Sequence, residues 1–330
     1  MKGLIATGGT GGHIAPAIAL KKFMMIKKID VKVISDKRGK KVFSGFTPDF
    51  LIDAYPLNNK RFIMNLISIV KSLFYIKRYK PDFVIITGGY ATFPVAIASL
   101  ILRIPLFIIE ANSVPGTITR TFAKFSEITF FAFPPVVDFK YRYKVTGLPI
   151  REEIVKFGQK KRAKKSDSIL IAGGSLGAES LIKMAFKIAR DFPDQKFILI
   201  RGNKRSSYGK KPDNLSVVDF CKDMVSLYRK TKITITRGGG SFLSEILYLG
   251  IPSLVVPYPY AKGNHQWYNA KFFEKTGLGM MIEDKKLDQI NNLLYFMLSN
   301  YKKFKIDEKY SYYHLNPSEV IVEELSNYVW

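Results

Sequence analysis

A strand, a glycine-rich turn and a helix open this chain, and together they constrain its fold more than any other feature. The apolar residues 4–6 lead into Gly8-Gly9-Thr10-Gly11-Gly12-His13, and a helix-forming segment follows. Glycine permits positive φ and a close approach of ligands, and the first N–H groups of a helix lack intrahelical partners. These groups and the helix dipole favour an anionic or strongly polar ligand, with His13 at the mouth of the turn.

The same unit recurs along the chain. Residues 83–87 form an apolar run that ends in Gly88-Gly89-Tyr90, and residues 106–109 form another that ends in Glu110-Ala111-Asn112. Residues 168–172 lead into Gly173-Gly174-Ser175-Leu176-Gly177-Ala178. Such runs are typical of parallel strands covered on both faces, and they predict an α/β fold of two Rossmann-like domains whose parallel sheets face a cleft. We expect the domains to span residues 1–148 and 149–316, with a last helix over 317–330 packing back on the first.

Composition limits the alternatives. The formal net charge of +25 indicates either an anionic partner or a general bias toward lysine. A single cysteine, Cys221, excludes an intramolecular disulfide, and no uncharged apolar stretch is long enough to cross a membrane. The first residues enter a strand directly, so we expect no signal peptide and a location inside the cell.

Two common nucleotide-binding classes fit poorly. The dinucleotide-binding fingerprint Gly-x-Gly-x-x-Gly needs a small residue at its third glycine position, but when the pattern starts at Gly9 that position is Ile14. Asp36, at the end of the second predicted strand, does resemble the ribose-binding acid of a dehydrogenase. No Gly-Lys-Ser/Thr follows the turn, which excludes a P-loop. There is no Asp-x-Asp pair and no His/Cys cluster at metal-ligand spacing, so we expect no metal and no cofactor.

The second half carries two further motifs. Backbone N–H groups at residues 240–242 are suited to a diphosphate and Glu245 to a ribose diol, unless Glu245 is simply a solvated acid in the first helical turn. The amides in residues 264–269 are suited to sugar hydroxyls, unless His265 and Gln266 only cap the helix.

Together, in order and from residue 3 to about 280, these motifs resemble the MurG family of GT-B glycosyltransferases (family 28). The segments that carry the resemblance are residues 8–13, 88–90, 110–112, 147–151, 173–178, 237–245 and 265–269. It implies an inverting, metal-independent transfer of N-acetylglucosamine from UDP-GlcNAc to the muramyl 4-hydroxyl of lipid I, which yields lipid II for peptidoglycan synthesis. It also implies a peripheral protein at the cytoplasmic face of the inner membrane, with roles in cell shape and division and with other cell-wall synthesis proteins as partners.

The resemblance carries site residues over by position. The predicted UDP-GlcNAc contacts are Thr10, Gly11, Gly12, Asn112, Arg151, Ser175, Phe220, Cys221, Met224, Gly240, Ser241, Phe242, Glu245, His265, Gln266 and Asn269. His13 is the candidate base, since an imidazole pKa near 6.5 suits proton transfer at neutral pH, unless it only braces the turn. Glu110 either orients His13 or replaces it. Ala111 and Leu148 depart from the family's usual Gln and Asn.

Residues 60–80 are basic and apolar without an acidic residue. A helix of this kind lies well on an anionic leaflet, although one face must also pack on the sheet. The predicted membrane-contact residues are Lys60, Arg61, Phe62, Ile63, Leu66, Ile69, Lys71, Phe74, Lys77 and Arg78.

Two other classes remain. A UDP-GlcNAc 2-epimerase would share the GT-B architecture but is expected to carry more carboxylates and histidines. A nucleic-acid-binding module would use the positive charge, yet it would leave the glycine turns unexplained and no recognition module is visible, so we expect no nucleic-acid partner.

Overall fold

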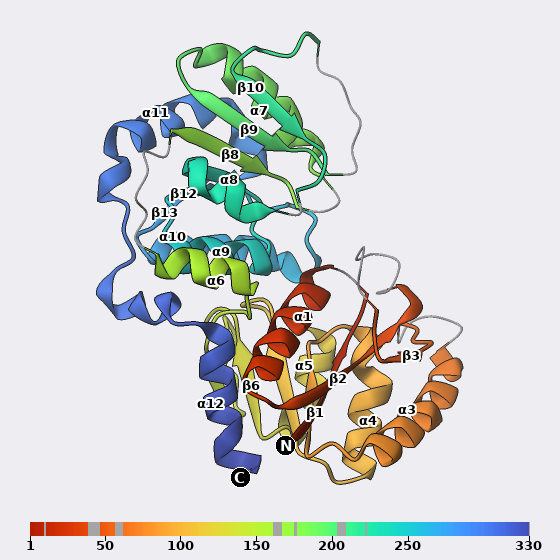
Figure 1. The fold of residues 1–330 in the computed structure, drawn as a ribbon. Coiled ribbons are helices and arrows are strands. Elements are labelled where there is room, and N and C mark those ends of the chain that lie inside the picture. The colour runs from red at the N-terminus through yellow and green to blue at the C-terminus, as the bar shows by residue number, and fades with distance from the viewer. Residues whose placement is uncertain are drawn as a thin grey trace. The chain divides into compact units, whose positions relative to one another are not determined.

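A computed structural model describes residues 1–9, 11–38, 47–56, 62–160, 167–174, 177–202, 209–221 and 223–329. The chain forms two compact units (Figure 1). Unit 1 comprises Met1–Glu152 together with Leu315–Trp330, and unit 2 comprises Glu153–His314. Unit 1 extends past residue 148 because the segment after its last strand packs inward, with the Leu148 and Ile150 side chains buried.

Unit 1 contains a parallel sheet in the order β3-β2-β1-β4-β5-β6-β7. Its strands are β1 (Lys2–Thr7), β2 (Asp30–Asp36), β3 (Phe50–Ile52), β4 (Phe83–Ile86), β5 (Leu106–Glu110), β6 (Ile128–Phe131) and β7 (Tyr143–Val145). The central strands are buried along almost their whole length, as expected for a sheet covered on both faces.

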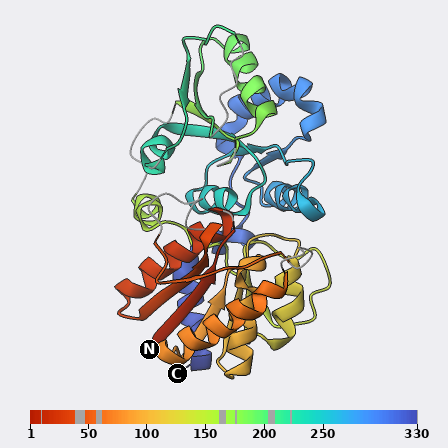
Figure 2. The ribbon, with the colours of Figure 1, turned by 90° about the vertical axis from the view of Figure 1, so that its right-hand side faces the viewer.

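Helices cover both faces of this sheet (Figures 1 and 2). They are α1 (Gly11–Ile26), α3 (Asn65–Tyr79), α4 (Phe93–Ile101), α5 (Thr117–Phe122) and α12 (Pro317–Val329), with short 3₁₀ turns η1 (Phe62–Met64), η2 (Tyr90–Thr92) and η3 (Ala123–Phe125). Helices α1 and α12 pack together, whereas α3, α4 and α5 share a core with the other face of the sheet. No helix among the described residues is long and apolar enough to span a bilayer.

The C-terminal helix α12 belongs to unit 1, although unit 2 separates it from the rest of that unit in sequence. Ile321 and Leu325 are fully buried. The Tyr328 ring meets Phe107 of β5 edge-on at 5.7 Å, and its hydroxyl accepts a hydrogen bond from Arg142 at 2.9 Å. Helix α12 is therefore part of the unit 1 core.

Unit 2 repeats the architecture with a parallel sheet in the order β10-β9-β8-β11-β12-β13. Its strands are β8 (Ser168–Ala172), β9 (Lys196–Ile200), β10 (Leu215–Val218), β11 (Thr231–Thr236), β12 (Ser253–Val255) and β13 (Gly279–Met281). Its helices are α6 (Glu152–Gln159), α7 (Glu179–Asp191), α8 (Met224–Lys230), α9 (Gly240–Leu249), α10 (His265–Lys275) and α11 (Ile290–Asn300), with η4 (Lys262–Asn264), η5 (Asp284–Gln289), η6 (Tyr301–Lys303) and η7 (Glu308–His314). Helices α7 and α11 share one core cluster with the sheet.

In each unit the order of the strands reverses once. The chain moves outward from β1 to β3 and then resumes at β4, on the other side of β1; in unit 2 it does the same at β8 and β11. Ligands of open α/β sheets bind outside the carboxyl ends of the strands at such a reversal. The predicted glycine turns after β1, β4, β8 and β11 lie at these positions, and the predicted two-domain parallel α/β fold is confirmed.

The packing of α12 can be tested by truncating its buried side chain. Ile321→Ala should lower the free energy of unfolding of unit 1 by about 2–5 kcal/mol, since it leaves a cavity in the core. Urea unfolding measures this, with the exposed neighbour Glu323→Ala as control. Equal stability of the two variants would contradict the packing described.

Candidate active site

His13 lies in the first turn of α1, beside the end of β4. Its Nδ1 atom is 2.7 Å from the carbonyl oxygen of Thr87. A carbonyl oxygen only accepts, so Nδ1 donates the hydrogen in this bond and Nε2 keeps the lone pair of the neutral ring. The contact therefore selects the tautomer in which Nε2 can take up a proton.

The glycines after β4 allow the imidazole to lie against the backbone. Gly88 and Gly89 have φ of 75° and 74°. A Cβ atom added at either would approach the His13 ring at 3.6 Å and 3.4 Å, respectively. Beneath them, the Thr87 hydroxyl donates to the Thr7 hydroxyl at 2.9 Å, which joins β4 to β1. The two glycine turns of unit 1 thus form one surface around His13.

Asp36, at the end of β2, holds the first glycine turn. Its Oδ1 atom accepts a hydrogen bond from the Gly9 N–H at 3.1 Å. A Cβ atom on Gly8 would lie 2.5 Å from that oxygen and 2.6 Å from the Cβ atom of Ala91. Asp36 is buried and stabilises the turn through this bond. Its role here is structural, unlike that of the acid that contacts the ribose in a dehydrogenase.

Glu110 is buried at the end of β5 and organises the loop that follows. Its Oε1 atom accepts from the backbone N–H of Asn112 at 3.1 Å and from the Asn112 amide at 3.4 Å. Its Oε2 atom accepts from the Gly116 N–H at 2.9 Å and from the Thr119 hydroxyl at 2.6 Å. Glu110 thereby fixes Asn112 and the start of α5, whereas the partner of His13 Nδ1 is the Thr87 carbonyl.

The first turn of α1 is open around its two glycines. Gly11 has no atom within 4 Å of an added Cβ atom, and Gly12 is exposed. Thr10 lies outside the described residues, as do Ser175, Lys60 and Arg61, and the side chain of Phe62 is not described either. Arg151 lies in unit 1, one residue before its end.

In unit 2 the turn after β11 packs tightly against the start of α10. A Cβ atom on Gly238 would lie 2.3 Å from the backbone oxygen of Gln266. Asn269, fully buried, donates its amide hydrogen to the Gly238 carbonyl at 3.0 Å. Asn269 therefore locks α10 to the turn that begins α9 at Gly240.

Arg237, which sequence reasoning did not assign a role, holds this edge of the sheet together. Its guanidinium is buried and donates to Asp284 Oδ1 at 2.5 Å and to the Ser180 hydroxyl at 2.7 Å. It also donates to the carbonyl oxygens of Val256 and Pro257, at 3.2 and 3.3 Å. One side chain thus connects the start of α7 with the loops after β12 and β13.

Glu245 lies in the second turn of α9 and is oriented by a buried tyrosine. The Tyr228 hydroxyl donates to Glu245 Oε2 at 2.5 Å. The Tyr228 ring, fully buried, is 6.1 Å from the ring of Phe242. Tyr228 was missing from the sequence prediction because its helix, α8, carries no recognised motif.

The predicted UDP-GlcNAc contacts Phe220, Cys221 and Met224 lie between β10 and the first residue of α8. Phe220 is 61% exposed, whereas Met224 is buried. The Cys221 thiol donates to the Asp223 carbonyl at 3.1 Å, and the Asp223 carboxylate caps α8 by accepting from the Ser226 N–H at 3.1 Å. The segment therefore presents one exposed aromatic ring from a capped helix start.

His265 and Gln266 bond to their own loop. His265 Nδ1 is 2.8 Å from the Lys262 carbonyl oxygen, and Gln266 Oε1 accepts from the Tyr258 N–H at 3.0 Å. Both side chains thus brace the loop that leads into α10. Among the residues described, no group of three or more His, Cys, Asp or Glu is arranged to hold a metal ion.

Two doubly wound units, each with glycine turns at its strand reversal, define the GT-B class of fold. The model of the glycosyltransferase family 28 N-terminal domain matches residues 4–130, and that of the C-terminal domain matches residues 168–324. The chain belongs to glycosyltransferase family 28, within the MurG family, and is a glycosyltransferase.

Individual relatives agree with this assignment. The chain is 34% identical, over 98% of both chains, to a Thermosipho africanus protein named UDP-N-acetylglucosamine–N-acetylmuramyl-(pentapeptide) pyrophosphoryl-undecaprenol N-acetylglucosamine transferase. It is 33% identical to a Sulfurihydrogenibium protein of the same name, over 87% of this chain and 86% of that one.

Solved structures share the fold. The crystal structure of Acinetobacter baumannii MurG aligns over 99% of both chains with a TM-score of 0.73 and 23% identity. A UDP-GlcNAc 2-epimerase from Neisseria meningitidis aligns over 99% of this chain and 100% of that one, with a TM-score of 0.65 and 16% identity. These likenesses show the architecture alone.

The role of Glu110 can be tested by removing its charge. Glu110→Gln replaces one of the two accepting oxygens by an N–H₂ donor, so that N–H and O–H groups which now donate to the carboxylate face another donor. The variant should lower the stability of unit 1 by about 1–3 kcal/mol. Urea unfolding compares it with Glu127→Gln, an exposed glutamate at the start of the next strand. Unchanged stability with abolished turnover would instead make Glu110 a group that acts on the substrate.

Proposed function

We propose that this enzyme transfers N-acetylglucosamine from UDP-GlcNAc to the muramyl 4-hydroxyl of lipid I with inversion, and so forms lipid II and UDP. The observation that carries the proposal is the identity of 33–34% over most of the chain to relatives named for this transfer. The His13 imidazole at the strand reversal of unit 1, with Nδ1 bonded to the Thr87 carbonyl, is consistent with the need of this transfer for a base.

The donor nucleotide is assigned to unit 2. The N-terminus of α9 at Gly240 offers N–H groups and a positive dipole end to a diphosphate. Glu245, held by Tyr228, accepts hydrogen bonds from the ribose hydroxyls, and Phe220 presents its exposed ring to the base. Arg151 is assigned to the diphosphate and Asn112, fixed by Glu110, to the donor sugar.

His13 is assigned as the general base. Nε2 takes the proton of the acceptor hydroxyl while the hydroxyl oxygen attacks the anomeric carbon. The bond from that carbon to the diphosphate oxygen breaks, and UDP leaves with the electron pair. The Nδ1–H bond to Thr87 persists in the imidazolium, where a charged donor strengthens it.

A UDP-GlcNAc 2-epimerase shares the fold, but the relatives that match over the whole chain are named as transferases. One assay separates the two reactions. The chain is incubated with UDP-GlcNAc, with and without a lipid I analogue, and UDP release is followed. Acceptor-dependent release is expected, whereas a sugar isomer formed without release would identify an epimerase.

His13→Ala should reduce kcat by about 10²–10⁴-fold, because it removes the base, and should change the KM for UDP-GlcNAc little. Steady-state kinetics with saturating acceptor measure both constants. His314→Ala, which removes another histidine bonded to a backbone carbonyl, is the matched control. Nearly intact turnover in His13→Ala would show that the imidazole only braces the turn.

Contact with an anionic membrane is assigned to η1 and α3. The inward face of α3 is largely polar, with Asn65, Ser68 and Ser72 buried. The outward face is apolar, and its most exposed side chains are Ile63 at 68%, Leu66 at 60%, Met64 at 41%, Ile67 at 50%, Val70 at 65% and Phe74 at 58%. Ile69 is half-buried, and Lys71, Lys77 and Arg78 are exposed around this face.

This reversed pattern fits a helix that lies in a membrane interface. Apolar side chains enter the leaflet, and each lysine or arginine contributes about 1 kcal/mol through anionic head groups. Met64, Ile67 and Val70 are exposed on the same face and extend the predicted contact set.

Val70→Glu should weaken binding to vesicles of anionic phospholipid about tenfold or more, since it replaces an inserted apolar group by a charge. Co-sedimentation measures the affinity at several salt concentrations. Phe125→Glu, on η3, is the control with a similarly exposed apolar residue. If the vesicle affinity of the parent chain did not change with the anionic lipid content or with the salt concentration, the membrane assignment would be wrong.

A further inference from the structure

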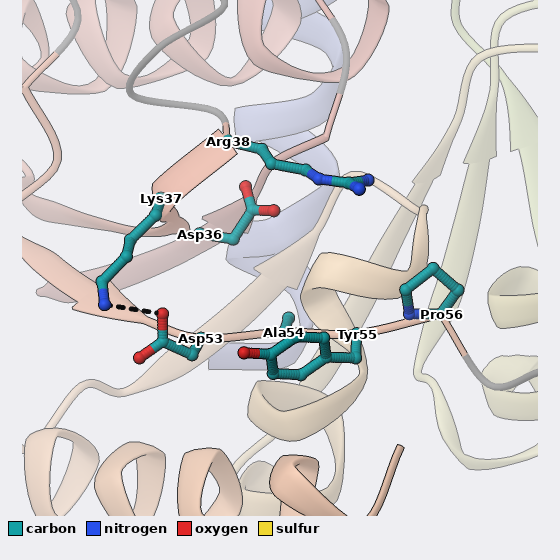
Figure 3. A pocket seen from close by; sticks show the side chains of 7 residues that line it. All are labelled: Asp36, Lys37, Arg38, Asp53, Ala54, Tyr55 and Pro56. Carbon is teal, nitrogen blue, oxygen red and sulfur yellow. Dashed lines mark ion pairs between the residues drawn. The ribbon is translucent and has the colours of Figure 1, made fainter. Parts of the chain in front are cut away.

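A cavity of about 340 Å³ opens at the carboxyl edge of the unit 1 sheet, and none of the site residues assigned above lines it (Figure 3). Its lining comes from residues 36–38, at the end of β2, and residues 53–56, after β3. Two cationic side chains, Lys37 and Arg38, extend from one side of it and share the lining with the carboxylates of Asp36 and Asp53. The cavity therefore offers two cations at the ligand-binding edge of the sheet, and both carboxylates already accept hydrogen bonds or ion pairs from the protein.

The two cations are held loosely enough to accept a ligand. Lys37 Nζ is 3.0 Å from Asp53 Oδ1, in a pair whose lysine side chain is 70% exposed. Exposed pairs of this kind contribute at most about 1 kcal/mol, so a doubly charged anion can take over the ammonium. Arg38 donates one N–H to the Tyr90 hydroxyl at 2.8 Å. A guanidinium has five N–H donors in a planar fork suited to phosphate oxygens.

On one side the cavity adjoins the turn that carries His13. Asp36, in its lining, accepts from the Gly9 N–H at 3.1 Å. Tyr90, bound to Arg38, directly follows the Gly88-Gly89 pair against which the imidazole lies. The cavity and the proposed base thus share the same two glycine turns.

On the other side the cavity is bonded to α3. Asn65 exchanges two hydrogen bonds of 3.0 Å with the backbone of Tyr55, and the Ser68 hydroxyl donates to the Asp53 carbonyl. Lys71 Nζ lies 3.9 Å from Asp53 Oδ2 and brings a third cation to this wall. The outward face of the same helix carries the apolar side chains described above.

Three chemistries therefore follow one another across unit 1: the proposed base beside glycine turns, a cavity with a lysine and an arginine, and an apolar helix face. The acceptor proposed above has the matching order of a sugar, a diphosphate and a polyprenyl chain. We infer that the Lys37–Arg38 cavity binds the acceptor's diphosphate, an inference that rests on the proposed function. The peptide stem branches from the sugar and does not lie between sugar and lipid, so it does not fit this order.

The kinetic test uses two soluble acceptors that share the muramyl pentapeptide and a short chain and differ only in the diphosphate between them. Arg38→Ala should raise the KM of the diphosphate acceptor about tenfold or more, through loss of a charge-assisted contact, and leave the KM of UDP-GlcNAc unchanged. For the acceptor without the diphosphate, Arg38→Ala and the parent should have the same KM. Lys37→Ala should act in the same direction, and the exposed Lys124→Ala should have no effect.

Equal losses with both acceptors would overturn the inference, as would an increase confined to the KM of UDP-GlcNAc, which would assign Arg38 to the donor diphosphate. A binding measurement keeps the inference separate from the proposed function. With the donor site saturated by UDP, inorganic pyrophosphate should bind the parent and Lys124→Ala, and bind Arg38→Ala more weakly. If pyrophosphate binds in this way but UDP release does not depend on the acceptor, the cavity is a diphosphate site and the proposed acceptor is wrong. If the parent does not bind pyrophosphate, the cavity is not a diphosphate site.

Discussion

The hydrogen bond between His13 and the Thr87 carbonyl joins the two halves of the unit 1 sheet at the place where the strand order reverses. It requires β1 and β4 to be neighbours, and the backbone after β4 favours glycine because Gly88 and Gly89 have positive φ, at 75° and 74°. The orientation of one ring thus depends on the topology of the whole sheet. Asp36, Glu110 and Tyr90 hold the surrounding loops through their hydrogen bonds.

In unit 2 a buried arginine, in place of an imidazole, makes the contacts that hold the carboxyl edge of the sheet together. Arg237 gathers three segments at the carboxyl edge of the sheet, and Asn269 fastens α10 to the adjacent turn. A buried arginine is tolerable there because Asp284 and backbone oxygens accept its hydrogens. Each unit therefore keeps its glycine turns open to a ligand by fixing the residues around them.

The sequence predicts the fold well where strands are long and buried. The apolar runs at β1, β4, β5 and β8 are continuous, and glycine turns mark their ends. No strand is predicted from the sequence at β3, β6, β7 or β13. Three of these have only three residues each, and the exposed Tyr-Lys-Val of β7 has no apolar pattern. The hydrogen-bond partners of the site residues cannot be predicted from the sequence either. Tyr228 and Ser180 are separated from their partners in sequence, and no pattern reveals that four hydrogen-bond donors surround the Glu110 carboxylate, which is predicted to orient or replace His13.

Unit 1 contains both ends of the chain, and unit 2 is inserted within it. During synthesis the ribosome completes unit 2 while α12 is still missing from unit 1. Unit 2 is contiguous and can fold as soon as it emerges, whereas unit 1 must keep the surface that receives Ile321 and Leu325 uncovered until α12 has been made. Without α12, the unit that carries His13 lacks one of its packing layers.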